Sequence, residues 1–430
     1  MTVTVLVAVT HRLETRLVTA LEDAPDLSVV RRCADLPDLL AAAAAGMADL
    51  AVVSADLRSL DRDALRHLAA HGVRVAGFAE PHDEAGERRL RQLGVAAVLG
   101  PDTRPEDLAR ILRAVVAGTT AHPSGPVAEP SPWAPDGRAG LAAAGRGTIT
   151  AVWGPTGAPG RTTVAVTLAA ALAAAGIETL LVDLDTYGAA VAQSLGLLDE
   201  APGVAAAARA SEGGLLDVAG LSRLAPRVGP RLRVLTGIPT PHRWTEVRGA
   251  AVEDILALSR SLAEHVVVDC GFGVEDDEEL SYDTAAPRRN ATTLTALEQA
   301  DHLLVVGAGD PVGLQRLVRA VQELAERPAP APVVVVTKVR ASVAGPHPER
   351  QIREVLARFA GLEAPRFVPW APADCDAAIL AGRSLVEAAP HAAVTQAITA
   401  LATVVDDRAE AAVRDRSDRG RPRRVTARRG

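Results

Sequence analysis

A glycine-rich segment near the middle of the chain has the residue types of a phosphate-binding loop. The apolar run 149–153 leads into GPTGAPGRTT, residues 154–163, and an Ala/Leu/Val-rich helical pattern follows. A strand, a glycine-rich turn and a helix N-terminus place backbone N–H groups and the positive end of the helix dipole around an anion. Arg161 and Thr162 stand where a basic residue and a hydroxyl would meet the terminal phosphates and Mg²⁺.

The loop departs from the pattern G-x-x-x-x-G-K-[ST] at two positions. Pro155 stands six residues before Arg161, where the pattern has glycine, and arginine replaces the lysine. Arginine keeps the charge and can bind phosphate through two N–H groups, but it is larger and planar. Taken alone, the segment has an alternative interpretation as an ordinary strand-to-helix turn without a ligand.

Carboxylates follow two further strand patterns. Residues 179–182 lead into Asp183 and Asp185, and residues 265–268 lead into Asp269. Ligands of parallel α/β sheets bind at the carboxyl ends of the strands, so these side chains would lie beside the loop. There a carboxylate can hold Mg²⁺ or orient an attacking water. Each aspartate could instead be a helix cap or end a strand in a turn, but the order of the three elements favours nucleotide binding.

The elements that must position these residues form an α/β series between residues 148 and 405. Seven apolar runs in it are typical of strands: ITAVW, TLLVD, LRVLTG, HVVVD, HLLVVG, VVVVT and RFVP. Helical or loop stretches separate them, which predicts a doubly wound, mostly parallel sheet.

Residues 1–117 contain a shorter alternation of the same kind, which predicts a small parallel sheet with helices on both faces. Its strand candidates are 3–9, 50–54, 73–78 and 96–99, and its helical stretches include 13–21 and 63–70. Residues 118–147 are rich in Pro, Gly, Ala and Ser and predict a linker.

Composition limits the possible classes of protein. Aromatic residues make up only 2% of the chain, which disfavours all-β sandwiches and aromatic platforms for single-stranded nucleic acid. No apolar run approaches the ~20 residues of a membrane span. The N-terminus lacks a signal-peptide pattern, and the three cysteines have no disulfide or metal spacing. We therefore expect a cytoplasmic protein without a membrane span.

The basic residues are almost all arginine. Lys338 is the one lysine among 46 basic residues, so it is the single candidate for any catalytic lysine. We expect residues 406–430 to be a disordered tail, because from Arg414 onward it carries eight arginines against two aspartates and no apolar periodicity. Weak, salt-dependent contact with nucleic acid and a solubilising role are equally good interpretations of it.

Together these segments resemble the MinD/ParA superfamily of deviant-Walker P-loop ATPases, most closely its CpaE-like members of actinobacterial type. The resemblance rests on GPTGAPGRTT, LLVDLDTYGAAVAQSLGL, HVVVDCGFG and VPWAPADCDAAILAGRSLVEAAP. It implies an α/β fold with a degenerate receiver-like (flavodoxin-like) domain over residues 1–117. A P-loop NTPase domain with a mostly parallel, doubly wound sheet would follow over residues 148–405.

The resemblance also implies roles for the site residues. Asp183 and Asp185 would lie in the first switch, near the attacking water and the metal, and Asp269 would be the Walker B carboxylate. The Mg²⁺ that accompanies ATP would be held by Thr162, Asp185 and Asp269. The nucleotide-binding residues would be Gly157, Ala158, Pro159, Gly160, Arg161, Thr162, Thr163 and Thr337.

Several positions differ from the family pattern. Thr156 stands where family members carry a signature lysine that reaches across a dimer, and Arg161 replaces the Walker lysine. Hydrolysis needs positive charge at the γ-phosphate, so we expect slow or absent turnover. After the run 333–336, Thr337 stands near the place of an adenine-contacting asparagine. Arg340 replaces the aspartate that would recognise guanine.

The receiver-like domain lacks the residues for phosphoryl chemistry. Where receivers have acidic residues after the first and third strands, this chain has Val9, Thr10 and Ser54, and Gly100 and Pro101 replace the lysine after the fifth. We therefore expect a surface for docking or dimerisation. The acidic run 275–279 is interpreted as a solvated loop, with a switch formed near Arg288 and Arg289 as the alternative.

These observations predict an ATP-dependent spatial regulator that dimerises and meets a protein partner through its receiver-like domain. By resemblance, its process would be pilus or secretion assembly, or septum placement. The alternatives are a non-hydrolysing scaffold, supported by Arg161 and Thr156, and a ParA-like DNA-partition protein, supported by the arginine-rich tail alone.

Overall fold

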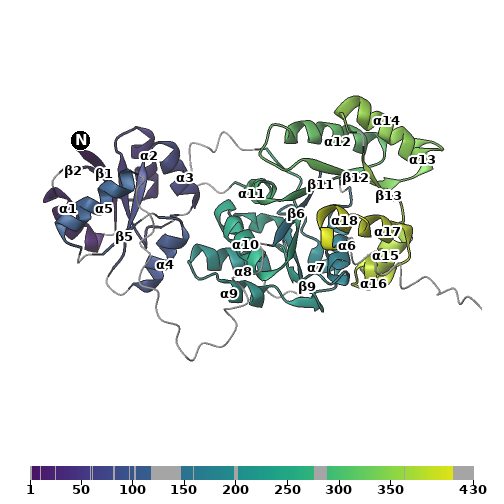
Figure 1. The fold of residues 1–430 in the computed structure, drawn as a ribbon, viewed down its shortest axis with the longest axis horizontal. Coiled ribbons are helices and arrows are strands. Elements are labelled where there is room, and N and C mark those ends of the chain that lie inside the picture. The colour runs from purple at the N-terminus through teal and green to yellow at the C-terminus, as the bar shows by residue number, and fades with distance from the viewer. Residues whose placement is uncertain are drawn as a thin grey trace, which may run out of the picture. The chain divides into compact units, whose positions relative to one another are not determined.

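The computed structural model describes residues 2–117, 147–275 and 288–409, except for residues 10, 25, 59, 61, 81–82, 96, 101–102, 158, 198–201 and 363. Over this range the chain forms two compact units, each with its own sheet (Figure 1). The first unit comprises the described residues up to 117 together with residues 209–216 and 288, and the second comprises the other described residues from 147 to 409.

The first unit has a five-stranded parallel sheet in the order β2-β1-β3-β4-β5. Its strands are β1 (Val3–Ala8), β2 (Leu27–Arg32), β3 (Leu50–Ser54), β4 (Arg74–Phe78) and β5 (Val98–Leu99). Its helices are α1 (His11–Glu22), α2 (Leu36–Ala44), α3 (Arg62–Ala70), α4 (Glu84–Gln92) and α5 (Pro105–Val116). Alternate side chains of each strand face opposite ways, so α2, α3 and α4 cover one face while α1 and α5 cover the other.

The sequence analysis missed one strand of this unit. β2 reads LSVVRR, and its burial falls from Leu27 towards the two arginines at its end. Such a pattern suits an edge strand, which has one neighbour and little buried surface, but it lacks the apolar run used to find the other strands.

The second unit has an eight-stranded sheet in the order β13-β12-β11-β6-β10-β7-β9-β8. Every pair is parallel except β8 and β9, which confirms the expected mostly parallel α/β sheet. The strands are β6 (Thr148–Trp153), β7 (Thr179–Leu184), β8 (Arg227–Gly229), β9 (Leu232–Leu235), β10 (His265–Cys270), β11 (His302–Ala308), β12 (Pro332–Val339) and β13 (Arg366–Pro369). The short antiparallel β8 was not predicted, because three residues with one apolar side chain show no periodicity.

Helices cover both faces of this sheet. In chain order they are α6 (Arg161–Ala174), α7 (Val191–Ser194), α8 (Gly203–Glu212), α9 (Val218–Leu224), the 3₁₀ turn η1 (Pro241–Glu246), α10 (Gly249–Leu262), α11 (Ala291–Gln299), α12 (Pro311–Leu324), α13 (Ala341–Ala344), α14 (Pro348–Ala360), α15 (Pro372–Leu380), α16 (Leu385–Ala388), α17 (Ala393–Thr399) and α18 (Ala402–Val405). The last four helices pack beside α6 (Figure 1).

Helix α6 lies inside this unit. Its residues from Val164 to Leu172 are all buried, and they contact the sheet on one side and the C-terminal helices on the other. A helix that is apolar on all sides needs such surroundings. Burial on every side therefore fixes the position of its N-terminus, where the glycine-rich loop ends.

The chain stays folded past residue 405, where the sequence analysis ended the domain. Ala409 is fully buried. Asp406 accepts hydrogen bonds from Arg408, and His265 Nδ1 lies 3.1 Å from its carboxylate. Thr150 Oγ1 lies 2.8 Å from the other ring nitrogen of His265. The order hydroxyl, imidazole, carboxylate matches a catalytic triad, but all three residues are buried, so the group ties the segment after α18 to β6 and β10.

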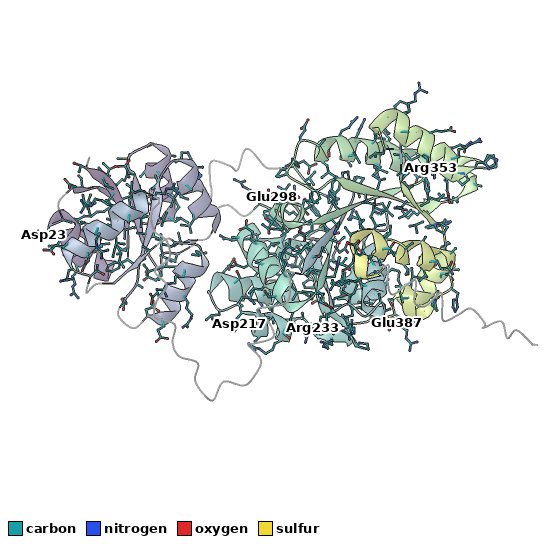
Figure 2. The ribbon with its side chains drawn as sticks, viewed as in Figure 1. Asp23, Asp217, Arg233, Glu298, Arg353 and Glu387 are labelled. Carbon is teal, nitrogen blue, oxygen red and sulfur yellow. The ribbon has the colours of Figure 1, made fainter. Side chains whose placement is uncertain are left out.

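Figure 2 labels Arg233, which lies in β9 beside the edge strand β8. Arg233 in β9 donates to the carbonyl oxygens of Ser222 and Ala225, at 3.0 Å and 2.9 Å, and so holds the end of α9. Among the described residues, no helix is long and apolar enough to cross a membrane.

Candidate nucleotide-binding site

The glycine-rich loop joins the central strand β6 to α6. Gly160 is the N-cap of α6 with φ +96°, and Gly157 has φ +106°. Both values lie in the left-handed region that favours glycine. Ala158, predicted to bind nucleotide, lies outside the described residues. The loop therefore presents the N-terminus of α6, with its unpaired N–H groups, at the carboxyl end of β6.

Close packing explains the glycine at the start of the loop. A side chain at Gly154 would collide with the carbonyl oxygen of Val306 in the neighbouring strand β11. Thr163, in the first turn of α6, lines a small cavity of about 30 Å³ together with Thr162. The loop thus starts against one strand and ends on a buried helix, which fixes both of its ends.

Arg161 folds back beneath the loop. Its Nη1 donates to the carbonyl oxygens of Gly154 and Pro155, at 3.0 Å and 3.1 Å. Its Nη2 lies 3.2 Å from Asp185 Oδ2, and both side chains are largely buried. The arginine that replaces the usual lysine therefore joins the loop to the segment after β7.

Thr162 and Asp269 form the second pair of the site. The Thr162 hydroxyl donates to Asp269 Oδ2 at 2.6 Å. The other carboxylate oxygen, Oδ1, is buried without a partner among the described residues. Burial, with the nearby Asp183 carboxylate, raises the pKa of Asp269 well above its usual value. A buried Oδ1 without a described hydrogen-bond partner is suited to contact a cation or a bound water.

Asp183 lies at the site, but its carboxylate holds the backbone after β7. It pairs in register with Asp269 across β7 and β10, but its oxygens accept the backbone N–H groups of Asp185 and Val191, both at 3.1 Å. Burial raises its pKa to about 7. Asp183 therefore shapes the turn after β7.

Asp185 anchors that turn and faces the loop. Its Oδ1 accepts the N–H groups of Tyr187 and Gly188, at 2.8 Å and 3.0 Å, while Oδ2 faces Arg161. Of the three predicted catalytic carboxylates, Asp269 alone keeps an oxygen without a partner among the described residues.

Thr337 lies at the site, but its side chain hydrogen-bonds the backbone of the loop. Its hydroxyl hydrogen-bonds the carbonyl oxygen of Pro159 and lies 3.2 Å from that of Gly307. The residue is 5% exposed. Thr337 therefore couples β11 and β12 to the loop, through backbone atoms of a residue predicted to bind nucleotide.

Sequence reasoning missed a cluster around Tyr187. The Tyr187 hydroxyl donates to Asn290 Oδ1 at 2.7 Å, and its ring lies 4.4 Å from that of Phe272. The guanidinium of Arg289 lies 3.8 Å above the Tyr187 ring and donates to Thr186 O at 3.0 Å. A tyrosine just after Asp185, in a chain with only two tyrosines, was the available signal.

This cluster joins the segments after β7 and β10. A side chain at Gly273 would collide with Asn290, and one at Gly271 would lie 3.4 Å from both Asp185 and Tyr187. The predicted switch between the acidic run and Arg289 cannot be followed, because residues 276–287 lie outside the described range. Within that range, Arg289 contacts Thr186 and Tyr187.

Unpartnered buried atoms gather at this site. Among the described residues they include Arg161 Nε, Asp269 Oδ1, Thr186 Oγ1 and Arg289 Nε. A buried polar atom without a partner costs about 1–3 kcal/mol. Arg161 Nε and Asp269 Oδ1 lie at the loop and the start of α6, so this pair fits a site that is completed by a polar ligand. The atoms of Thr186 and Arg289 belong to the cluster around Tyr187. No described cluster of three or more His, Cys, Asp or Glu side chains could hold a metal alone. Thr162 and Asp269 thus fit a magnesium ion that phosphates also coordinate.

Among the residues that the structure describes, the first unit has no comparable group of buried carboxylates at the carboxyl edge of its sheet. Ser54 is buried with its hydroxyl unpartnered among the described residues. Arg89 hydrogen-bonds the carbonyl oxygen of Ala55 and donates to that of Leu60 at 3.1 Å. Thr10 and Pro101, two of the positions expected to have lost receiver chemistry, lie outside the described residues, as do residues 118–146 of the expected linker and the tail from residue 410.

Comparison with known proteins is consistent with this geometry. The crystal structure of a ParA family ATPase from Chlorobium tepidum is 17% identical, with a TM-score of 0.50, and the match covers 60% of this chain and 98% of that one. This likeness shows the fold. The cell division ATPase MinD from Pyrococcus furiosus is 19% identical, with a TM-score of 0.47, over 60% of this chain and 97% of that one.

A third solved structure, the septum site-determining protein MinD from Pyrococcus horikoshii complexed with Mg-ADP, is 18% identical, with a TM-score of 0.48, over 62% of this chain and 98% of that one. No curated protein sequence matches. A family model does match, that of the CobQ/CobB/MinD/ParA nucleotide binding domain, and it spans residues 150–379, more than half of the chain. The chain therefore belongs to the CobQ/CobB/MinD/ParA family of nucleotide-binding domains.

Proposed function

We propose that this chain is a Mg²⁺-dependent ATP-binding switch of the MinD/ParA type, with slow or absent hydrolysis, in which the bound nucleotide controls dimerisation and partner binding. The observation that carries the proposal is the arrangement of Arg161, Thr162 and Asp269 beneath the glycine-rich loop. Thr162 and Asp269 would hold Mg²⁺, which supplies charge that offsets the phosphates. Arg161 and the N–H groups at the start of α6 would bind phosphate oxygens.

The contacts of Arg161 provide the switch. Phosphate binding would compete with Asp185 for its guanidinium, and Asp185 also holds the turn that ends in Tyr187. Because Tyr187 contacts Phe272 and Asn290, a change at Asp185 would reach the segment after β10. Nucleotide state would thus alter the surface formed by these segments.

The carboxylates support slow turnover. Asp183 is engaged by backbone N–H groups, and Asp185 by backbone N–H groups and Arg161, so neither has an oxygen directed at an attacking water. A general base must lie within hydrogen-bond reach of the proton that it takes. These contacts of Asp183 and Asp185 therefore favour nucleotide binding over hydrolysis.

The first unit would act as a docking domain of receiver-like type. Its strand order is the flavodoxin-like order 2-1-3-4-5, and Ser54 stands where a receiver would carry its acceptor aspartate. By the CpaE-like pattern of the whole chain, we place the switch in pilus or secretion assembly, or in septum placement, in the cytoplasm.

A titration with fluorescent ATP and ADP, with and without Mg²⁺, tests the proposal. We expect saturable, Mg²⁺-enhanced binding by the wild type, at least a 100-fold loss in Arg161→Ala, and ATP-dependent dimers by light scattering. Arg223→Ala, in α9 of the same unit, is the control and should bind as the wild type does. No binding at millimolar ATP by a folded wild type would contradict the proposal.

A second candidate is a scaffold that uses the fold without nucleotide. Its support is that Arg161 already has three partners, two carbonyl oxygens and Asp185, in the structure without ligand. The same titration separates the two, because a scaffold that uses no nucleotide would show no saturable binding of ATP or ADP.

A further inference from the structure

A second arginine lies on the outer side of the loop. Arg316 is an exposed residue of α12, and its Nη1 is 3.4 Å from the carbonyl oxygen of Thr156, a long and weak contact. Its guanidinium also occupies the space that a side chain at Gly157 would fill. Among the described residues no carboxylate pairs with it, so most of its donors remain available.

Helix α12 holds this arginine in place. Asp310 caps the helix by accepting the Gly313 N–H at 2.9 Å, and a side chain at Gly313 would collide with the carbonyl of Ala308 at the end of β11. Leu317, the next residue after Arg316, is fully buried against Gly307 of β11. The base of the Arg316 side chain is therefore fixed relative to the loop.

The site carries more negative than positive groups, so a further cation such as Arg316 would offset the charge of a bound triphosphate. Three buried carboxylates, those of Asp183, Asp185 and Asp269, lie near Arg161, whose largely buried side chain faces Asp185. A triphosphate brings further negative charge into this region, and one Mg²⁺ offsets only two charges. An available guanidinium at the rim can bind a phosphate through two parallel hydrogen bonds.

We propose that Arg316 is a phosphate-binding residue that distinguishes nucleoside triphosphate from diphosphate by binding the terminal phosphate over Thr156 and Gly157. The inference rests on the proposed function, since it requires nucleotide in the loop. It assigns a positive charge at the rim of the site to Arg316 in α12, which lies 160 residues after Thr156 in the sequence.

Competition binding with ATP and ADP tests it on the full chain. We expect Arg316→Gln to weaken ATP binding about 10-fold and ADP binding less than 3-fold, and Arg316→Lys to recover part of the ATP preference. Arg319→Gln is the matched control, because Arg319 is exposed on the same helix but lines the groove between α12 and α14. It should leave both affinities unchanged.

The outcomes separate the two proposals. A wild type that binds ATP, with an unchanged ratio of ATP to ADP affinity in Arg316→Gln, would overturn this inference and leave the proposed function standing. Equal losses for ATP and ADP would also overturn it, because Arg316 would then only hold the loop. A folded wild type that binds no nucleotide would overturn both. Circular dichroism of each variant checks that it is folded.

Discussion

An arginine with similar hydrogen bonds lies at the carboxyl edge of each sheet, but the polar residues around the two arginines differ. In the first unit, Arg89 hydrogen-bonds two backbone carbonyl oxygens after β3. In the second, Arg161 donates to two carbonyl oxygens of the glycine-rich loop. Each has a buried Nε without a partner among the described residues. The difference lies in the acidic groups, since Arg161 also faces Asp185 while Ser54 is the buried polar residue where β3 ends.

This comparison shows that the parallel sheet alone does not create a site. An arginine bound only to carbonyl oxygens fastens a loop, whereas one shared between a loop and a carboxylate can be drawn away by a competing anion. The following experiments test whether the two edges differ in this way.

The largest expected effect is on metal dependence. In Asp269→Asn the side chain keeps its shape but loses its charge, so Mg²⁺ should no longer strengthen ATP binding, and we expect about a 100-fold loss of ATP affinity in the presence of Mg²⁺. Isothermal titration with and without Mg²⁺ measures this. Ser54→Asn, at the other edge, should leave nucleotide binding unchanged, and an equal loss there would remove the distinction between the edges.

The next effect concerns the glycines that follow a strand at each edge. Gly154→Ala forces a methyl group against the backbone of β11, so we expect the second unit to lose about 1–3 kcal/mol of stability. Gly100 follows β5 and has nothing within 4 Å of an added Cβ, so Gly100→Ala should change stability by less than about 0.5 kcal/mol. Urea unfolding followed by tryptophan fluorescence tests the first change, and hydrogen exchange of β5 tests the second.

A third comparison concerns the aspartates that hold the amino edges of the two sheets, and the dependence of stability on pH. Asp406 is buried, which would raise its pKa, but hydrogen bonds from His265 and Arg408 hold the pKa below its usual value. A lowered pKa stabilises the fold above about pH 4, and this stability is lost as the pH falls further. We expect Asp406→Asn to cost about 1–3 kcal/mol at pH 7, with the difference from wild type shrinking below pH 4.

The matching tie in the first unit is exposed. Asp49 accepts the hydroxyl and the N–H of Thr4, at 2.7 Å and 3.0 Å, which lowers its pKa. Asp49→Asn should therefore destabilise less than Asp406→Asn when urea midpoints are compared. A larger effect at Asp49 would contradict the role given to burial.

The smallest effect is expected at Arg89. Replacing it with methionine keeps much of its apolar stem and removes the donors to Ala55 and Leu60. Amide exchange in residues 55–60 should accelerate several-fold, while the Kd for ATP stays within twofold of wild type. A change in nucleotide affinity would show that the first edge takes part in binding.

Local patterns were enough to predict the elements at the second edge. The glycines, the hydroxyl and the carboxylates each follow a short apolar run, and the strands that carry them pair as expected, with Asp183 beside Asp269. The strands β2 and β8 were missed because edge strands bury few side chains. A local pattern did not indicate which of the three aspartates accept backbone N–H groups in a turn and which keeps an oxygen without a described partner.

Contacts between distant residues were beyond such reasoning. Thr337 meets Pro159 from 178 residues away, and Arg316 meets Thr156 from 160 residues away. Tyr187 and Asn290 are 103 residues apart. The first two contacts depend on the strand order that places β11 beside β6 and β12 beside β11, and the third depends on the pairing of β7 with β10. Periodicity indicates that a strand exists, but not which strand is its neighbour.

The tie between His265 and Asp406 has a consequence for how the second unit is attached to the rest of the chain. His265 begins β10, so Ala409 follows a residue anchored at the amino edge of the sheet. Gly147, which precedes β6, is bonded to Arg260 at that same edge. The described segments that enter and leave this unit are thus held at the edge of the sheet opposite the glycine-rich loop, so neither tether covers the loop.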